Sequence, residues 1–319
     1  MQSKAEAKPI LLYIAGAGHS GSSLLDYLLG AAPDIVPLGE FHRLSIAPSE
    51  RRCSCLDTIA NCPYWEDLRH FHADRTATRL PSWEDLPLSL QPSTPRERMG
   101  RTLTLAAIVV GLRYPPRTKY SRGYQVVVQN SWEAYESIAI RHQAYAVVDS
   151  TKNPLRLFEL YRSRPSQLYA IHLVRDGRAV AASQVRRTGA SWLSAVLSWR
   201  ATQFKVERAL GAVKADRRLL VRYEDLCKHP EQEINRIREH IGLATKTRLD
   251  RIDREGHMIP GNPVLLSGIT EVRRDDRWVD EIPSWAEGLF RILAGSKNRS
   301  FGYQSRVRVK RSVLRRFTQ

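Results

Sequence analysis

Residues 10–29, ILLYIAGAGHSGSSLLDYLL, decide the fold expected of this chain. The segment opens with strand-forming apolar residues (10–14) and closes with leucines at helical spacing (24–29), and glycines and serines join the two. A strand, a glycine-rich turn and a helix make a phosphate cradle, because the turn N–H groups converge and the helix N-terminus adds partial positive charge. The segment therefore predicts an anion site.

The turn departs from the most familiar phosphate loop. Gly16 and Gly21 have the spacing of a Walker A loop, but Ser22 and then Ser23 stand where its lysine would follow. A Walker lysine reaches the β- and γ-phosphates of a nucleoside triphosphate, so a loop without it suits another phosphate-bearing donor. The alternative is a turn that binds nothing. It is disfavoured because Ser20 and its neighbours supply hydroxyl donors.

The composition of the 319 residues is that of an ordinary globular protein, with 42% hydrophobic and 26% charged residues, except for a net charge of +17. Such a charge implies an anionic cofactor or substrate, or attraction to nucleic acid or acidic lipid. No apolar run approaches the roughly 18 residues that span a bilayer, and the first residues lack a signal-peptide core. The four cysteines do not form a disulfide framework. We therefore expect a cytoplasmic protein.

Downstream, strand and helix patterns alternate, as in a parallel sheet built from right-handed βαβ units. We expect an α/β fold with four or five parallel strands flanked by helices, of P-loop type, in one domain covering about residues 8–305. A substrate or lid insertion occupies about residues 41–122, and a basic tail follows at 306–319. The further strands are expected at 35–38, 144–149, 168–174 and 219–226, and the helices of the poorly readable region at 103–112 and 131–142.

Several polar residues follow the expected strands, where open α/β sheets bind ligands. Glu40 and His42 come directly after the strand at 35–38, and Lys152 comes after the strand at 144–149. Glu40 is the candidate general base and His42 its competitor; the alternatives are a surface carboxylate and a solvated lysine.

Arg175 and Ser183 stand eight residues apart, one at a strand end and one two turns into the next helix. A guanidinium matches phosphate oxygens in a bidentate manner, and a hydroxyl adds a third donor. The alternative is a strand-end arginine paired with Asp176 and a serine that faces solvent.

The segment from Gly18 to Ile35, with the Leu38-Gly39-Glu40 that follows it, resembles the 5′-phosphosulfate loop and first helix of sulfotransferases that use 3′-phosphoadenosine 5′-phosphosulfate (PAPS). The resemblance covers about residues 10–303, with 66–122 unmatched. It implies in-line transfer of a sulfuryl group to an acceptor hydroxyl or amine, with release of adenosine 3′,5′-bisphosphate (PAP). The donor-binding residues it implies are Gly18, His19, Ser20, Gly21, Ser22, Ser23, Arg175 and Ser183.

The same resemblance implies roles for other residues. Glu40 would deprotonate the acceptor, and His19 and Lys152 would stabilise charge on the sulfuryl group. His19 departs from the family, which usually has arginine or lysine there. Residues 256–278 would close over the nucleotide, which makes Arg273 and Arg274 candidates for the 3′-phosphate. The donor has no triphosphate to chelate a metal, so no metal is expected.

Cys53, Cys55 and Cys62 form a small cluster, and His70 and His72 follow it. Structural zinc sites use four cysteine or histidine ligands, usually in regular pairs, so this set is incomplete. Other bacterial-type sulfotransferases carry a similar segment. We expect a structural lid with buried thiols or a local disulfide, and no metal.

Two other function classes stay open at this stage. A P-loop kinase of a small molecule would need a Walker lysine, which is missing, and an acidic Mg²⁺ ligand, a role that Asp149 could fill. A non-enzymatic, basic nucleic-acid binder would need a recognisable module, and the sequence has none. The acceptor, whether a small molecule, sugar, lipid or peptide, and the oligomeric state do not follow from the sequence.

Overall fold

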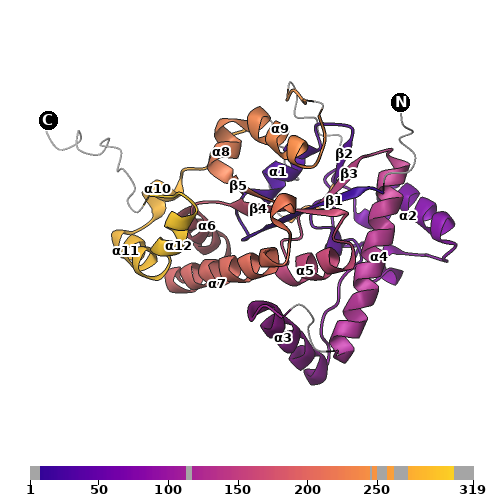
Figure 1. The fold of residues 1–319 in the computed structure, drawn as a ribbon, viewed down its shortest axis with the longest axis horizontal. Helices are drawn as coiled ribbons and strands as arrows, with labels where there is room; N and C mark the ends of the chain where they lie inside the picture. The colour runs from indigo at the N-terminus through magenta and orange to yellow at the C-terminus, as the bar shows by residue number, and fades with distance from the viewer. Residues whose placement is uncertain (1–7, 113–116, 245, 250–256, 262–271, 305–319) are drawn as a thin grey trace, which may run out of the picture.

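Five parallel strands form the centre of the molecule in a computed structural model, which describes residues 8–112, 117–244, 246–249, 257–261 and 272–304 (Figure 1). The strand order is β2-β3-β1-β4-β5. The basic tail at 306–319 and residues 256 and 262–271 of the expected closing segment lie outside the described residues. The strands are β1 (Ile10–Gly16), β2 (Ile35–Pro37), β3 (Ala146–Asp149), β4 (Leu168–Val174) and β5 (Arg218–Arg222).

Strand β1 occupies the middle of this sheet. Its register pairs Ile10 with Ala146 of β3 and Leu11 with Leu168 of β4. A central parallel strand is covered on both faces, so it consists of a continuous apolar run rather than an alternating one. This arrangement explains why residues 10–14 are the clearest strand signal in the sequence.

Helices cover both faces of the sheet, and α1, α8 and α9 lie across from α5 and α7 (Figure 1). Leu11 and Tyr13 of β1 share a buried cluster with residues of α4, α5 and α7, whereas Leu12 and Ile14 share one with α1 and α9. No helix of the described residues is long and apolar enough to cross a membrane. The longer helices are α1 (Ser22–Leu29), α2 (Pro63–Thr76), α3 (Pro95–Val109), α4 (Lys119–Arg141), α5 (Pro154–Ser163), α6 (Gly177–Thr188), α7 (Trp192–Gly211), α9 (Pro230–His240) and α11 (Ser284–Leu293), and the shorter ones are α8 (Tyr223–Lys228), α10 (Trp278–Glu281) and α12 (Gly295–Ser300).

The helices of the insertion differ from those expected. Helix α3 starts eight residues before the expected 103, at a capping box in which Thr94 and Glu97 bond reciprocally. Helix α4 likewise starts at Lys119, after a capping box of Thr118 and Ser121, rather than at 131. Both helices carry exposed polar residues in their first turns, so hydrophobic periodicity alone placed the starts too late.

The prediction of a strand over residues 219–226 was wrong for residues 223–226. Strand β5 ends at Arg222, and Tyr223 begins helix α8. Acidic residues in the first turn, Glu224 and Asp225, favour a helix N-terminus. This early turn places the Tyr223 side chain beside the glycine-rich loop.

Candidate active site

The turn between β1 and α1 adopts the tight conformation that its glycines allow. Gly21 has a φ of 90°, and a Cβ atom there would lie 2.3 Å from the ring of Tyr223. His19 is also left-handed, with a φ of 63°. Only glycine meets both demands at position 21, because a side chain would be strained and would also collide with the tyrosine. The predicted strand–turn–helix cradle is present.

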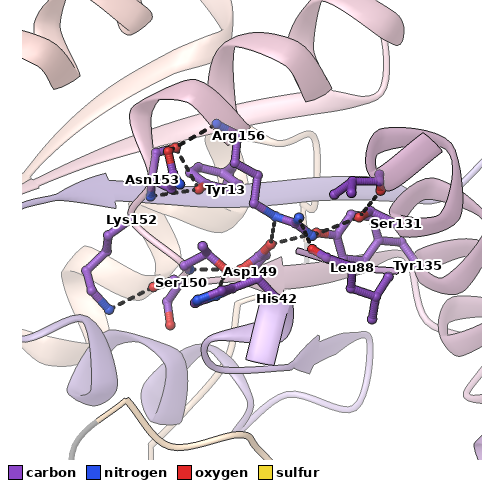
Figure 2. A network of polar contacts seen from close by, with 12 residues as sticks. Tyr13, His42, Leu88, Ser131, Tyr135, Asp149, Ser150, Lys152, Asn153 and Arg156 are labelled. Atoms are coloured by element: carbon purple, nitrogen blue, oxygen red, sulfur yellow. Dashed lines mark hydrogen bonds and ion pairs between the residues drawn. The ribbon is translucent and has the colours of Figure 1, made fainter. Parts of the chain in front are cut away.

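Lys152 connects the cradle to the candidate base. Its Nζ donates to Oγ of Ser22 at 3.1 Å and to Oε1 of Glu40 at 2.9 Å. A third bond runs to the carbonyl of Ser150 at 2.8 Å (Figure 2). The structure thus supplies an ammonium beside Ser22, the position where a Walker lysine would stand, but from the end of β3 instead of from the loop.

Glu40 is buried between two cations. Besides Lys152, Arg43 contacts it, with Nε 2.6 Å from Oε2. Burial raises the pKa of Glu40. Lys152 and Arg43 together lower the pKa by more than burial raises it, so the net shift is downward. The carboxyl group is therefore ionised at neutral pH and can accept a proton or hold a cation.

His42, two residues beyond Glu40, contacts Thr151 instead. Its Nδ1 is 3.1 Å from Oγ1 of Thr151, and that hydroxyl donates its only hydrogen to Oδ1 of Asp149 at 2.5 Å. Nδ1 must therefore carry the N–H, which leaves a lone pair on Nε2. Burial, with Arg156 as the second cause, lowers the pKa of His42 to about 4. His42 is neutral at pH 7 with Nε2 as an acceptor.

Asp149 anchors a buried network behind these groups. Oδ2 accepts hydrogen bonds from Tyr135 at 2.6 Å and from Nε of Arg156 at 3.0 Å, and Asp149 is fully buried (Figure 2). Thr151 occupies Oδ1 through both its backbone N–H and its hydroxyl. A carboxylate with these partners does not face solvent, so the Mg²⁺ ligand that a kinase would need is not available at Asp149.

Arg175 holds the cradle from the end of β4. Nη1 donates to the carbonyl of His19 at 3.2 Å and Nη2 to that of Asp275 at 2.7 Å. Its guanidinium also lies over the ring of Tyr223, 4.5 Å from the ring centre. The buried arginine thus brings together the glycine-rich loop, β4, α8 and the segment that contains Asp275.

The field at the cradle is positive. The pKa of His19 is lowered first by burial and then by Arg187, Arg175, Lys152 and Arg186. Cations that disfavour a proton on His19 favour an anion in the same place. His19 is therefore neutral in this field, and the surrounding arginines and Lys152 carry the charge.

The remaining predicted residues lie at the rim or within helices. Ser183 is buried in α6, two turns beyond Arg175. Arg274 pairs with Asp276, with Nη2 2.6 Å from Oδ2, and both are about half exposed. The backbone carbonyl of Arg273 accepts a long bond of 3.5 Å from Tyr223. The structure thus places Arg274 in an ion pair rather than in the cradle.

Sequence reasoning missed two contributors to this site, Tyr223 and Arg43. Tyr223 contacts both Gly21 and Arg175. Its position just after a strand was a usable signal. Arg43 gave none, because its contact with Glu40 becomes visible only in the fold. Residues 256–278 were expected to close over the nucleotide, and the structure pairs Ile259 of that segment with Gly39, whose φ is 70°.

Comparison with known proteins identifies the family. The model of the sulfotransferase family matches residues 9–247. The chain belongs to the sulfotransferase family. Comparison of this sulfotransferase with curated protein sequences gives no match.

A solved structure of another sulfotransferase shares the fold. The sulfotransferase domain of the Synechococcus PCC 7002 olefin synthase is 21% identical over 95% of this chain and 99% of that one, with a TM-score of 0.51. The sulfotransferase domain from the curacin biosynthetic pathway is 15% identical over 94% of this chain and 99% of that one, with a TM-score of 0.49. At these identities the likeness concerns the fold alone. The parallel sheet expected from the sequence, of P-loop type, is confirmed.

Proposed function

We propose that this sulfotransferase moves a sulfuryl group from PAPS to a hydroxyl or amine of an acceptor and releases PAP. The observation that best supports the proposal is the position of the Lys152 ammonium between the Ser22 hydroxyl and the Glu40 carboxylate. An anion-binding cation and a candidate base thus share one site. Family membership favours this function over the kinase and the nucleic-acid binder.

The cradle fits a phosphosulfate group. The Ser20 hydroxyl is buried and has no hydrogen-bond partner within the part of the chain that the structure describes. Leaving such a group unpaired costs about 1–3 kcal/mol, so an anionic oxygen near it is stabilising. A Cβ atom at Gly18 would meet nothing within 4 Å, which leaves room on that side of the loop.

Each residue then has a role toward the donor. PAPS supplies the sulfuryl group and leaves as PAP. The backbone N–H groups of residues 18–23 and the Lys152 ammonium would hold the 5′-phosphosulfate, while Arg175 and Ser183 would hold the 3′-phosphate. Arg273 and Arg274 would line the outer side of the nucleotide, with Arg274 leaving its pair with Asp276.

The acceptor's proton would go to Glu40. A carboxylate that shares Lys152 with the cradle faces the place where donor and acceptor must meet. Binding of the donor would draw the ammonium toward the new anion and leave Oε1 of Glu40 to accept the proton. His42, with its lone pair on Nε2, is the competing base. No catalytic metal is part of this proposal.

Two measurements test the proposed function. In thermal unfolding, PAP should raise the melting temperature and ATP with Mg²⁺ should not; the reverse result would overturn the proposal in favour of a kinase. In a transfer assay with ³⁵S-labelled PAPS, a panel of phenols, sugars, lipids and peptides should reveal an acceptor that becomes labelled only with active enzyme. Lys152→Ala should lose most of that transfer.

A further inference from the structure

Three cysteines and one histidine converge beside the segment that carries Glu40. The four candidate ligand atoms, three sulfurs and one ring nitrogen, all lie within 4.8 Å of one another. Nδ1 of His257 is 3.2 Å from Sγ of Cys62 and 3.6 Å from Sγ of Cys53. The sulfurs of Cys55 and Cys62 are 3.6 Å apart.

These separations are those of one coordination sphere. Around a Zn²⁺ ion with Zn–S bonds of about 2.3 Å and a Zn–N bond of about 2.0 Å, tetrahedral geometry places two sulfurs about 3.8 Å apart and a sulfur about 3.5 Å from the nitrogen. The distances of 3.2, 3.6 and 3.6 Å lie close to both values. A disulfide, in contrast, requires sulfurs at about 2.05 Å.

We propose that Cys53, Cys55, Cys62 and His257 bind one Zn²⁺ ion. Three thiolates and one imidazole form a soft, tetrahedral ligand set that selects zinc over Mg²⁺ or Ca²⁺. The protein supplies all four positions, so the site is closed and structural. It takes no part in the chemistry of sulfuryl transfer.

The backbone around Cys53 and Cys55 forms a tight loop that brings their two sulfurs together. A short antiparallel pairing of Arg52 with Thr58 closes a loop, in which Cys53 N donates to the carbonyl of Asp57 at 2.8 Å. Leu56 turns the chain with a φ of 82°. A leucine rarely adopts this conformation, so the loop is held against a local cost while its two sulfurs face the same centre.

His257 is held in register with that loop by contacts of its own. Its ring stacks on the ring of Tyr64, with centres 4.5 Å apart and planes 5° from parallel. The next residue, Met258, exchanges two bonds with Ser54: its carbonyl accepts from Ser54 N at 3.0 Å, and its N–H donates to Ser54 Oγ at 2.9 Å. These contacts aim Nδ1 at the sulfurs, as the outer contacts of a metal-binding histidine do.

The zinc site has a structural consequence for the active site. Ile259 N donates to the carbonyl of Leu38 at 3.0 Å, and Glu40 N donates to the carbonyl of Ile259 at 2.9 Å. A Cβ atom at Gly261 would lie 2.0 Å from Oε1 of Glu40. The metal would thus tie the cysteine loop to the strand-like segment that packs against the candidate base.

This inference differs from the expectation of a metal-free lid, because the fourth ligand lies 195 residues from Cys62 in the sequence. The two nearer histidines are engaged elsewhere: His70 is 2.9 Å from Oε1 of Glu66, and His72 is 2.8 Å from Oγ of Ser137. Sequence spacing could not select His257.

The first test measures zinc in protein purified without chelators, by elemental analysis. We expect one zinc per chain in the wild type and nearly none in Cys62→Ser or His257→Ala. His257→Cys should retain zinc, because a fourth thiolate replaces the imidazole. The matched controls are Cys227→Ser, which changes the cysteine outside the set, and His70→Ala; both should keep one zinc per chain.

A second test uses the wild type alone, because loss of a ligand can also unfold the chain. After zinc is withdrawn with a chelator, Co²⁺ should produce a sulfur-to-cobalt charge-transfer band and strong visible bands of tetrahedral cobalt, and added Zn²⁺ should abolish both. The proposal is overturned by metal-free wild type that shows no cobalt bands, by equal zinc in wild type and both ligand variants, or by a Cys55–Cys62 disulfide in freshly purified protein.

Discussion

Lys152 adopts a left-handed backbone conformation, with a φ of 62°, three residues after the end of β3. Such a conformation is uncommon for a residue with a side chain, and it persists where surrounding contacts maintain it. Here the ammonium makes three hydrogen bonds, to Ser22, Glu40 and Ser150. These three contacts hold the ammonium between the cradle and Glu40.

Glu40→Gln should lower kcat by about 10²–10⁴, because the amide keeps the shape and cannot accept a proton. Binding of PAP, measured by calorimetry, should hardly change. Glu50→Gln, at an exposed glutamate, is the matched control and should be fully active. If Glu40→Gln keeps near-wild-type single-turnover transfer while His42→Ala is inactive, the base is the histidine.

The pH profile tests the base independently. Burial raises the pKa of Glu40, but Lys152 and Arg43 bring it below the ordinary value, and burial lowers the pKa of His42 to about 4. A general base acts deprotonated, so kcat/KM should stay level down to about pH 5 and decline only below that. An acid limb near pH 6.5 in the measured profile would contradict both assignments.

Arg175→Ala should weaken the binding of PAP much more than the binding of adenosine 5′-phosphate, which lacks the 3′-phosphate. A lost charge-assisted pair costs about 1.5–3 kcal/mol, or roughly 10- to 150-fold in affinity. Arg208→Ala, at an exposed arginine of α7, removes the same charge elsewhere and should leave both affinities unchanged. Equal losses for the two ligands would show that Arg175 acts only by holding His19 and Asp275.

At the scale of elements, a buried acid joins helix α1 to the residue that follows β3. Asp26 is fully buried, and the Ser150 hydroxyl donates to its Oδ2. Burial raises the pKa of Asp26 to about 8, and the bond to Ser150 offsets only part of this. Near neutral pH the carboxyl group is therefore mostly protonated in the folded protein and ionised in the unfolded chain.

The free energy of unfolding of Asp26→Asn should increase relative to that of the wild type as the pH rises. The folded wild type binds a proton that the unfolded chain loses near pH 3.8, so its free energy of unfolding falls between pH 3.8 and about 8. The variant has no such proton. Urea unfolding at several pH values measures the difference, with the exposed Asp74→Asn as control. A difference that is constant with pH would show that Asp26 is ionised in the fold.

The candidate active site is assembled from residues at the ends of neighbouring strands. The cradle belongs to β1 and α1, its lysine follows β3, and its arginine follows β4. All three strands are neighbours in a parallel sheet, so their carboxyl ends meet at one edge. The 257–261 segment adds a further layer by pairing with Gly39.

At the scale of the whole molecule, the net charge of +17 should make donor binding sensitive to salt. The screening length falls from about 10 Å at 0.1 M salt to about 3 Å at 1 M, which weakens the attraction between a basic site and a polyanion. The affinity for PAP should fall several-fold over this range, as calorimetry would measure. Uncharged adenosine should show no such loss, and a salt-independent affinity for PAP would count against the anion site.

The sequence by itself determined the parallel sheet and the cradle. Residues 10–29 carry a local signal, since the strand, the turn and the helix depend on neighbouring residues. The spacing of Arg175 and Ser183, along one strand and one helix, is likewise a local signal, and their role toward the 3′-phosphate stays a prediction. The resemblance that these motifs carry led to the family. The single domain expected over about residues 8–305 stays a prediction.

Only the tertiary structure decided which distant residues meet. Lys152 reaches Ser22 across 130 residues, and His257 reaches Cys62 across 195. These residues are brought into contact by the order of the strands in the sheet and by the backbone pairing at Gly39, and not by their places along the chain. Hydrophobic periodicity predicts which face of a helix or strand is buried. It does not predict which polar groups from distant parts of the chain lie side by side in the fold. Which polar groups lie beside Ser22 and beside the three cysteines was for that reason decided by the fold.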